Sequence, residues 1–335
     1  MTPYIRQSLG LAVLKHCFLV FTLCTLVACA GTPLNLKDLR LTNIARSSDI
    51  PRIPFYPQIE DQCGPSSLAT MLGFQGVTIS PEALRGKLYI PGKEGTVTTE
   101  IIARARRFGL LVYPLETELI NILLEVNAGN PVLVMQNLGF NWLPAWHFSV
   151  VFGYDLARRK ISLRSGEVYK QELDFSLFQK TWARADSWAI VIVPPEKLPR
   201  TATETGLIKA ASQLEQVGEV SSALQAYRAM LAKWPDNAHA NFGAGNAAFA
   251  TGQPDEASAY FTDYLTLNPH SSKGWNNLAY SLAEKGCLSE AKKAIKCALK
   301  IEPENQNLLD SEQDIHQYPT RELRHACQSI DCLSR

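Results

Sequence analysis

The stretch that decides the fold of the first half is QIEDQCGPSSLATML, from Gln58 to Leu72. Pro65 fits the first turn of a helix, where its missing N–H has no intrahelical partner to lose. Apolar residues then recur on one face at i, i+3 and i+4 spacing, as Leu68, Met71 and Leu72. The pattern therefore predicts a helix that has Cys63 at its N-terminus.

A helix N-terminus favours a thiolate, because its free N–H groups and dipole carry positive potential worth about 0.3–2 kcal/mol. Lowering a thiol pKa from roughly 8.5 to roughly 4 requires about 6 kcal/mol. Activation of Cys63 therefore needs a second, cationic group, normally a histidine. The part of the chain between the amino-terminal apolar segment and residue 200 contains one histidine, His147.

The composition describes globular material with no strong electric field. The chain has 335 residues, 46% hydrophobic residues, 19% charged residues and a net charge of +1. The length favours two domains, and the balanced charge argues against nucleic acid or an anionic membrane surface as the main partner.

Residues 1–29 have the features of an export signal, with Arg6 and Lys15 ahead of an apolar run at 18–28. The run ends in Leu-Val-Ala-Cys29, which resembles the bacterial lipobox, whose cysteine is diacylated. An ordinary signal peptide or an uncleaved anchor is the alternative. The residue directly after Cys29 is Ala30 and not Asp. We therefore expect an outer-membrane lipoprotein that faces the periplasm, with residues 30–54 as a tether.

The distribution of cysteines separates Cys63 from the others. Four cysteines lie near the C-terminus, and in an oxidising periplasm they could form two disulfides of open pairing, from Cys287, Cys297, Cys327 and Cys332. A zinc site that also uses His316 and His325 is disfavoured, because the spacing fits no zinc template. We expect no cofactor.

Hydrophobic periodicity predicts helices first and strands afterwards in residues 55–195. We expect helices that begin near Cys63 and cover 81–87, 98–108, 118–126 and 175–182, and strands at 131–138, 147–154, 160–164, 168–173 and 188–193. This order predicts an α+β domain and is also the order of papain-like folds.

A repeat follows a linker at 196–206. Glycines, alanines and prolines recur at a spacing of 34 residues, at positions 218, 252 and 286, then 223, 257 and 291, then 235, 269 and 303. This pattern resembles the tetratricopeptide repeat and predicts an all-α domain at 207–335. We expect units near 204–237, 238–271 and 272–305, with a capping helix after Pro303.

Two motifs together resemble the bacteriocin-processing, double-glycine-leader cysteine peptidases, a papain-like family, over about residues 52–195. They are Asp61-Gln62-Cys63-Gly64-Pro65 and a strand that begins at His147. The resemblance implies that Cys63 attacks the scissile carbonyl and His147 transfers the proton. It also implies that Gln58 joins the Cys63 N–H in the oxyanion hole. Gln62 competes for that role, and either glutamine could instead be a solvated loop residue.

The third catalytic position departs from this family. A hairpin between the strands at 147–154 and 160–166 would place residues 165–168 opposite His147. The family usually has Asp where this chain has Ser165, and a serine can orient an imidazole but adds no charge. Asp155 is eight residues from His147, about 26 Å along a strand, so a turn role fits it better. Trp142 and Trp146 precede His147 and line a substrate groove or cover the core.

The sequence thus predicts a lipid-anchored cysteine peptidase whose catalytic residues are Cys63, His147, Gln58 and Ser165. Its substrate would be a peptide or protein, and the repeats would bind a protein partner. The alternative is an inactive, peptidase-like scaffold that binds peptides without cleaving them.

Overall fold

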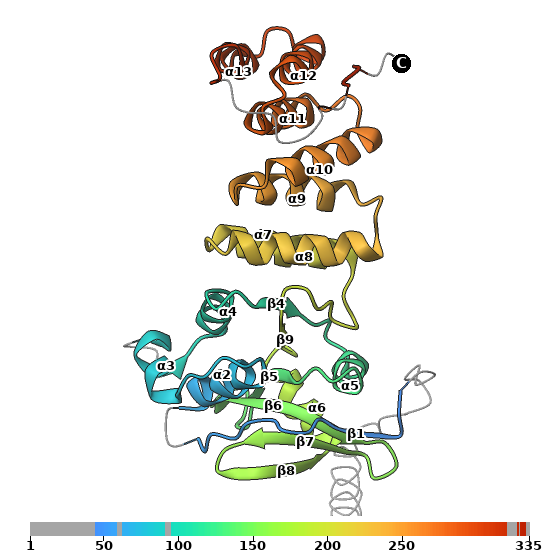
Figure 1. The fold of residues 1–335 in the computed structure, drawn as a ribbon. Coiled ribbons are helices and arrows are strands. Elements are labelled where there is room, and N and C mark those ends of the chain that lie inside the picture. The colour runs from blue at the N-terminus through green and yellow to red at the C-terminus, as the bar shows by residue number, and fades with distance from the viewer. Residues whose placement is uncertain (1–43, 59–61, 91–94, 320–326, 328, 333–335) are drawn as a thin grey trace, which may run out of the picture. The chain divides into compact units, whose positions relative to one another are not determined.

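A computed structural model describes residues 44–58, 62–90, 95–319, 327 and 329–332 (Figure 1). The expected signal segment, Cys29 and the first part of the tether lie outside the described residues. The described residues belong to one compact unit.

The described residues of the first half form a seven-stranded sheet, in which every neighbouring pair is antiparallel. Its order is β4-β9-β5-β6-β7-β8, and β1 pairs with one end of β6. The strands are β1 (Ser47–Asp49), β4 (Leu111–Pro114), β5 (Val132–Asn137), β6 (Trp146–Asp155), β7 (Lys160–Ser165), β8 (Val168–Asp174) and β9 (Ala189–Val193). A separate small hairpin joins β2 (Tyr89–Ile90) to β3 (Gly95–Thr96). The expected α+β class is confirmed.

Helices cover both faces of this sheet (Figure 1). They are α2 (Cys63–Phe74), α3 (Pro81–Leu88), α4 (Thr98–Arg106), α5 (Leu119–Asn127) and α6 (Phe175–Ala183). The apolar face of α2 packs on Phe148 and Val150 of β6 in the main core. Alternate residues of a strand point to opposite faces, and Gln136, the partner of His147 on β5, contacts Thr181 of α6. The helices α2 and α6 therefore lie on opposite sides of β5 and β6.

Several features of this half differ from the sequence prediction, among them the two short strands β2 and β3, which were not predicted. Residues 47–54 are part of the folded domain rather than of a tether, because β1 pairs with β6 and the side chains of Ile50 and Ile53 are buried. The strand β4 was not predicted either. It has four residues between two helices, too few to show a period.

The second half consists of paired helices that follow the 34-residue period (Figure 1). They are α7 (Glu204–Gln216), α8 (Val220–Lys233), α9 (Ala238–Ala250), α10 (Pro254–Leu267), α11 (Ser272–Lys285) and α12 (Leu288–Ile301), and α13 (Gln306–His316) is the expected capping helix. The repeated glycines have φ of +88°, +73° and +95° between the two helices of each pair, a conformation that favours glycine.

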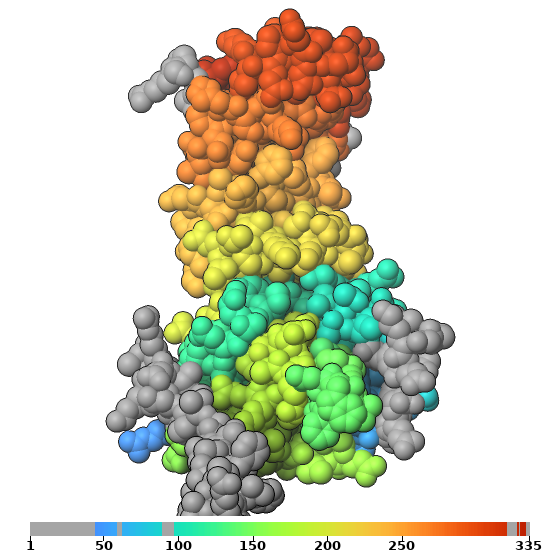
Figure 2. Space-filling view, turned by 180° about the vertical axis from the view of Figure 1, so that it is seen from behind, coloured from blue at the N-terminus to red at the C-terminus, as the bar shows by residue number. Residues whose placement is uncertain are grey.

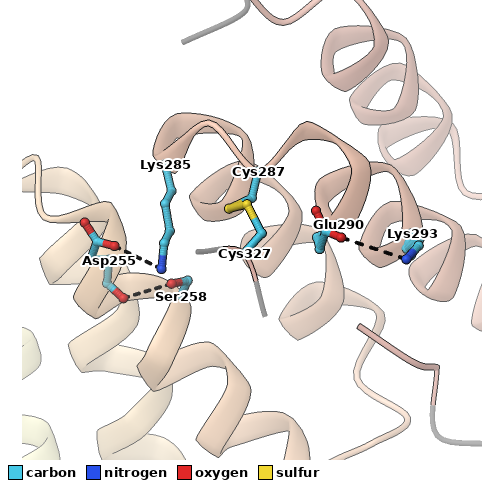
Figure 3. The surroundings of a disulfide bond; sticks show 7 residues. All are labelled: Asp255, Ser258, Lys285, Cys287, Glu290, Lys293 and Cys327. Carbon is cyan, nitrogen blue, oxygen red and sulfur yellow. Dashed lines mark hydrogen bonds and ion pairs between the residues drawn. A yellow bond between two sulfur atoms is a disulfide. The ribbon is translucent and has the colours of Figure 1, made fainter. Parts of the chain in front are cut away.

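The C-terminal cysteines form two disulfides, Cys287–Cys327 and Cys297–Cys332, which settle the pairing that the sequence left open. Figure 3 shows the first bond at the start of α12, beside the ion pair between Lys285 Nζ and Asp255 Oδ1 at 2.9 Å. Both cysteines of the alternative zinc site are thus oxidised. Among the described residues, no group of three or more His, Cys, Asp or Glu side chains could hold a metal, and no helix is long and apolar enough to span a membrane.

The predicted linker is ordered and held by a buried carboxylate. Glu125 of α5 is fully buried and accepts hydrogen bonds from the backbone N–H groups of Arg200 and Thr201 and from the Thr201 hydroxyl, at 2.6–3.2 Å. The helix α7 then packs on β4, and both views show α7 and α8 (yellow) beside the segment that holds α4 and β4 (teal; Figures 1 and 2).

Candidate active site

The helix α2 lies along β6, and two hydrogen bonds define its direction. Near its start, Ser67 Oγ donates to Phe148 O at 3.1 Å. Just after its end, Gln75 Nε2 donates to Ile192 O of β9 at 2.7 Å. Ile192 directly follows Val191 of β9. Val191 pairs with Val132 of β5, and Val132 pairs on its other side with Val151 of β6. The helix and the strand therefore run in the same direction.

This arrangement places Cys63 and His147 at the same end of the contact between α2 and β6. Cys63 lies one helical turn, about 6 Å, before Ser67, and His147 immediately precedes Phe148. Both residues are half-buried. Cys63 belongs to neither disulfide. The two residues that the sequence singled out thus share one end of the sheet.

Gln58 holds this end together. Its amide nitrogen donates to Ser67 Oγ at 3.1 Å and to Phe148 O at 3.2 Å, so contacts on α2 and β6 use both of its N–H groups. Its Oε1 accepts from the backbone N–H of Gly166 at 3.0 Å, and its own backbone N–H donates to Gly166 O at 3.0 Å. This geometry favours a positioning role for Gln58 over donation to an oxyanion.

Gln62, the competing glutamine, immediately precedes Cys63 and is the N-cap residue of α2. Its side chain makes no capping hydrogen bond, and it is half-buried. Among the hydrogen bonds of the described residues, none uses its amide, whereas Gln58 uses every N–H of its amide. Gln62 is therefore the glutamine with donors to spare beside Cys63.

His147 contacts the residue that the hairpin predicted. Its Nε2 lies 2.9 Å from Ser165 Oγ. The register of β6 and β7 pairs Val150 with Arg164, which places Ser165 opposite Ser149 and diagonal to His147. This contact occupies Nε2 and leaves the other ring nitrogen, Nδ1, for another partner.

Burial lowers the pKa of His147 below its ordinary value of 6.5. Among the hydrogen bonds and ion pairs of the described residues, none joins a carboxylate to this ring. A neutral imidazole is therefore favoured at neutral pH, and the protonated ring lacks the charge that an acidic third residue would supply.

Ser165 continues into a buried polar chain that the sequence analysis missed. Its Oγ lies 3.4 Å from Ser149 Oγ, which lies 3.1 Å from Gln136 Oε1, and Gln136 Nε2 lies 2.6 Å from Thr181 Oγ1. The available signal was the presence of Ser149 and Gln136 inside apolar strands, since buried polar side chains need partners.

Arg164 supports the strand end from the other face of the sheet. Its guanidinium is buried, donates to Ile53 O at 3.1 Å and to Tyr169 O, and stacks over the rings of Phe152 and Tyr169 at 4.3 and 3.9 Å. These contacts join the segment before Gln58 to the turn beside Ser165. Sequence analysis did not assign a role to Arg164.

Asp155 lies at the far end of β6 and accepts a hydrogen bond from the backbone N–H of Arg158 at 2.9 Å. This is the expected turn contact, and it keeps the carboxylate away from His147.

The loop between β5 and β6, together with the first residue of β6, presents apolar side chains to solvent directly before His147. The exposed fractions are 79% for Trp142, 64% for Phe140, 62% for Leu143 and 53% for Trp146. The rings of Phe140 and Trp142 stack with centroids 5.7 Å apart. The alternative that these tryptophans cover the core is therefore wrong.

Comparisons with known proteins divide the chain in the same way. Residues 50–190 match the Peptidase C39 like family, and residues 208–272 and 242–304 match the tetratricopeptide repeat. Protein FlbA of Caulobacter vibrioides is 34% identical over 123 residues, which are 37% of this chain and 20% of that protein. The chain thus spans about a fifth of the curated relative.

Solved structures of C39 peptidases share little sequence with this chain. A protein from Bacillus anthracis assigned as a C39-like peptidase is 18% identical with a TM-score of 0.38, covering 46% of this chain and 98% of the other. The peptidase domain of Streptococcus ComA, a bifunctional transporter, is 19% identical with a TM-score of 0.34, covering 43% and 99%.

The lowered pKa of His147 predicts how stability depends on pH. The unfolded chain binds a proton at His147 more readily than the folded chain, so the free energy of unfolding falls as the pH falls below about 6.5. The His147→Gln variant removes this contribution. Its midpoint of thermal unfolding should fall less than that of the wild type between about pH 7.5 and 5.5. His239→Gln, an exposed change in α9, is the control. A steeper loss in His147→Gln would contradict the assignment.

Proposed function

We propose that this chain, in which a C39-like peptidase domain precedes tetratricopeptide repeats, is a cysteine peptidase with Cys63 as nucleophile and His147 as base. The observation that carries the proposal is the His147–Ser165 contact at 2.9 Å, at the end of β6 where α2 begins with Cys63. The proposed nucleophile, base and orienting residue come from three separate elements, α2, β6 and β7, and Cys63 and His147 lie at the same end of the contact between α2 and β6.

The reaction follows from this arrangement. Cys63 Sγ attacks the scissile carbonyl carbon while its proton passes to Nδ1 of His147, and the carbonyl oxygen becomes an oxyanion. The tetrahedral intermediate collapses as His147 gives the proton to the leaving amine, which leaves a thioester on Cys63. Water then attacks the thioester and gives its proton to His147. The C–S bond then breaks, His147 returns the proton to Cys63 Sγ, and the carboxylic acid product leaves and ionises.

The burial of His147 indicates when the charge forms. Because its pKa is lowered, we infer that the resting pair is a thiol and a neutral imidazole and that the proton moves as the bond to carbon forms. This proposed resting state differs from our expectation from the sequence, in which Cys63 requires a cationic partner. The first turn of α2 and the amide of Gln62 are the proposed oxyanion donors, with Gln58 as a positioning residue.

The apolar loop that ends at Trp146 fits a substrate with bulky apolar side chains near the scissile bond. Aromatic side chains this exposed, directly before the proposed base in the chain, offer contact area without covering the core. The repeats form a module for recruiting a protein or peptide. If a variant in which a linker replaces the repeats binds its substrate with unchanged affinity, that role is contradicted.

A second candidate function is an inactive, peptidase-like module that binds peptides. The observation that favours it is the neutral Ser165 where an acidic residue would stabilise the imidazolium. The two candidates share the peptide-binding site and differ only in whether bonds are cleaved.

Incubation with a peptide library separates these candidates. A peptide library incubated with the protein should yield new termini that are found by mass spectrometry. The rate should fall by about 10²–10⁴-fold in His147→Ala and to background in Cys63→Ser. Alkylation of Cys63 by iodoacetamide should slow in parallel in His147→Ala. Ser162→Ala, a buried change elsewhere on β7, is the control. Retained peptides without cleavage in the wild type would establish the binding module instead.

The apolar loop supports a further prediction. Trp142→Ser should raise KM for peptides with an aromatic or aliphatic residue near the cleaved bond by about tenfold, which corresponds to about 1.4 kcal/mol of lost contact. The unfolding midpoint should not change, because Trp142 is exposed. Leu267→Ser, an exposed apolar change on α10, is the matched control. Equal KM values for Trp142→Ser and the wild type with every peptide would exclude a substrate role for this side chain.

We also propose that the protein is anchored to the periplasmic face of the outer membrane through a lipid on Cys29. The support is the apolar run that ends in Leu-Val-Ala-Cys29 and the absence of Asp after it.

The anchor predicts that cells fed labelled palmitate label the wild type and Cys24→Ser, but not Cys29→Ser. Separation of membranes by density should place the wild type with the outer membrane and move Cys29→Ser out of that fraction. An unlabelled wild type would contradict the proposal.

A further inference from the structure

We infer that two backbone carbonyl groups of α6, at Leu177 and Phe178, fix the tautomer of His147 through a chain of four side chains. The chain runs from Thr181 through Gln136 and Ser149 to Ser165. This inference rests on the proposed function, because it assigns positioning residues to the proposed base.

The chain is buried along its whole length. The exposed fractions are 5% for Thr181, 1% for Gln136, 0% for Ser149 and 8% for Ser165. Water therefore has little access to the hydroxyl groups, and each must find its donors and acceptors among its neighbours. The direction in which each hydrogen bond is donated is thus set by the chain itself.

The direction begins at α6. Thr181 Oγ1 lies 2.9 Å from Phe178 O and 3.2 Å from Leu177 O. Carbonyl oxygens only accept, so the single hydroxyl proton of Thr181 points at α6. Its oxygen must therefore accept from Gln136, and the atom of Gln136 that faces it, at 2.6 Å, is the amide nitrogen.

The same reasoning extends to His147. With its nitrogen toward Thr181, Gln136 presents Oε1 to Ser149, and the Ser149 hydroxyl donates to it at 3.1 Å. Ser149 then has no proton left for Ser165. The two hydroxyl oxygens lie 3.4 Å apart, the longest link in the chain, and we infer that Ser165 is the donor across it. Ser165 in turn has no proton for the ring, so His147 Nε2 must carry one and donate it, at 2.9 Å.

The consequence is a neutral ring with its proton on Nε2 and a free lone pair on Nδ1. The proposed mechanism needs this tautomer, because Nδ1 takes the thiol proton. Every bond in the chain points away from the ring, so each link polarises the next and strengthens Ser165 as an acceptor. The chain thus orients the imidazole, and stabilises it once protonated, without a carboxylate.

The test reads the tautomer directly, from the ¹⁵N chemical shifts of the His147 ring in the full chain, with His147→Gln to assign the signal. Thr181→Val removes the hydroxyl group that accepts the hydrogen bond from Gln136 but preserves the shape of the side chain. Gln136 can then turn its amide nitrogen toward Ser149 and reverse the chain. We expect the Nδ1–H form to rise to half of the neutral ring or more, and Cys63 alkylation near pH 7 to slow by about tenfold. Thr181→Ser should restore the wild-type tautomer.

Two further variants keep the inference falsifiable. Ser149→Ala breaks the chain in the middle and should also raise the Nδ1–H form, so the test does not depend on the folding of Thr181→Val. Ser162→Ala, a buried serine outside the chain, should leave the tautomer unchanged. A wild-type ring already protonated on Nδ1, or an unchanged tautomer in both Thr181→Val and Ser149→Ala, would overturn the inference.

The tautomer is measured without any substrate, so this result is independent of peptidase activity. If the protein cleaves peptides but the tautomer of His147 does not change in these variants, the role of the four side chains is rejected and the proposed function is kept. If the tautomer shifts in these variants but the protein cleaves no peptide, the role of the four side chains is kept and the proposed function is rejected.

Discussion

The side chain of Gln58 is the constraint on which the candidate site depends. Its two N–H groups bond to α2 and β6, and its oxygen bonds to the turn between β7 and β8. These are the elements that begin with Cys63, carry His147 and end with Ser165. A single amide in a partly buried position therefore fixes three elements that are distant in sequence. Arg164 reinforces the same junction by donating to Ile53 O and to Tyr169 O.

The sequence predicts the elements that have a clear period and the residues that depend on local register. The helix of Cys63, the strand of His147 and the diagonal contact with Ser165 follow from hydrophobic spacing and from the length of one hairpin. The repeats follow from their 34-residue period. The strand β1 could not be predicted, because its residues are polar and it is short.

Contacts between distant segments set the remaining features, and no local pattern encodes them. The roles of Gln58 and Glu125 depend on residues 108 and 76 positions away. The polar chain behind Ser165 needs α6 to pack on β5, and the disulfide pairing needs Cys327 and Cys332 to lie beside the two cysteines of the last repeat. In each case a buried polar group or a cysteine in the sequence shows that a partner is required but does not show which one.

A serine in the third position changes how the site can handle charge. A carboxylate stabilises an imidazolium by Coulomb attraction, whereas a hydroxyl chain offers only an oriented acceptor, and the burial that lowers the His147 pKa works in the same direction. A site of this kind favours proton transfer during attack over a resting ion pair. The neutral chain is thus compatible with catalysis by a weaker base, provided that the ring presents Nδ1 to the thiol.

The central claim is that Cys63 becomes acylated by a peptide, and the most direct measurement is acid quenching of the protein with a peptide library in ¹⁸O-labelled water. The account predicts a thioester on Cys63, seen by mass spectrometry, and one ¹⁸O atom in the new carboxylate of each product. Products that carry the label without any adduct on Cys63, or peptides that stay intact, would contradict it.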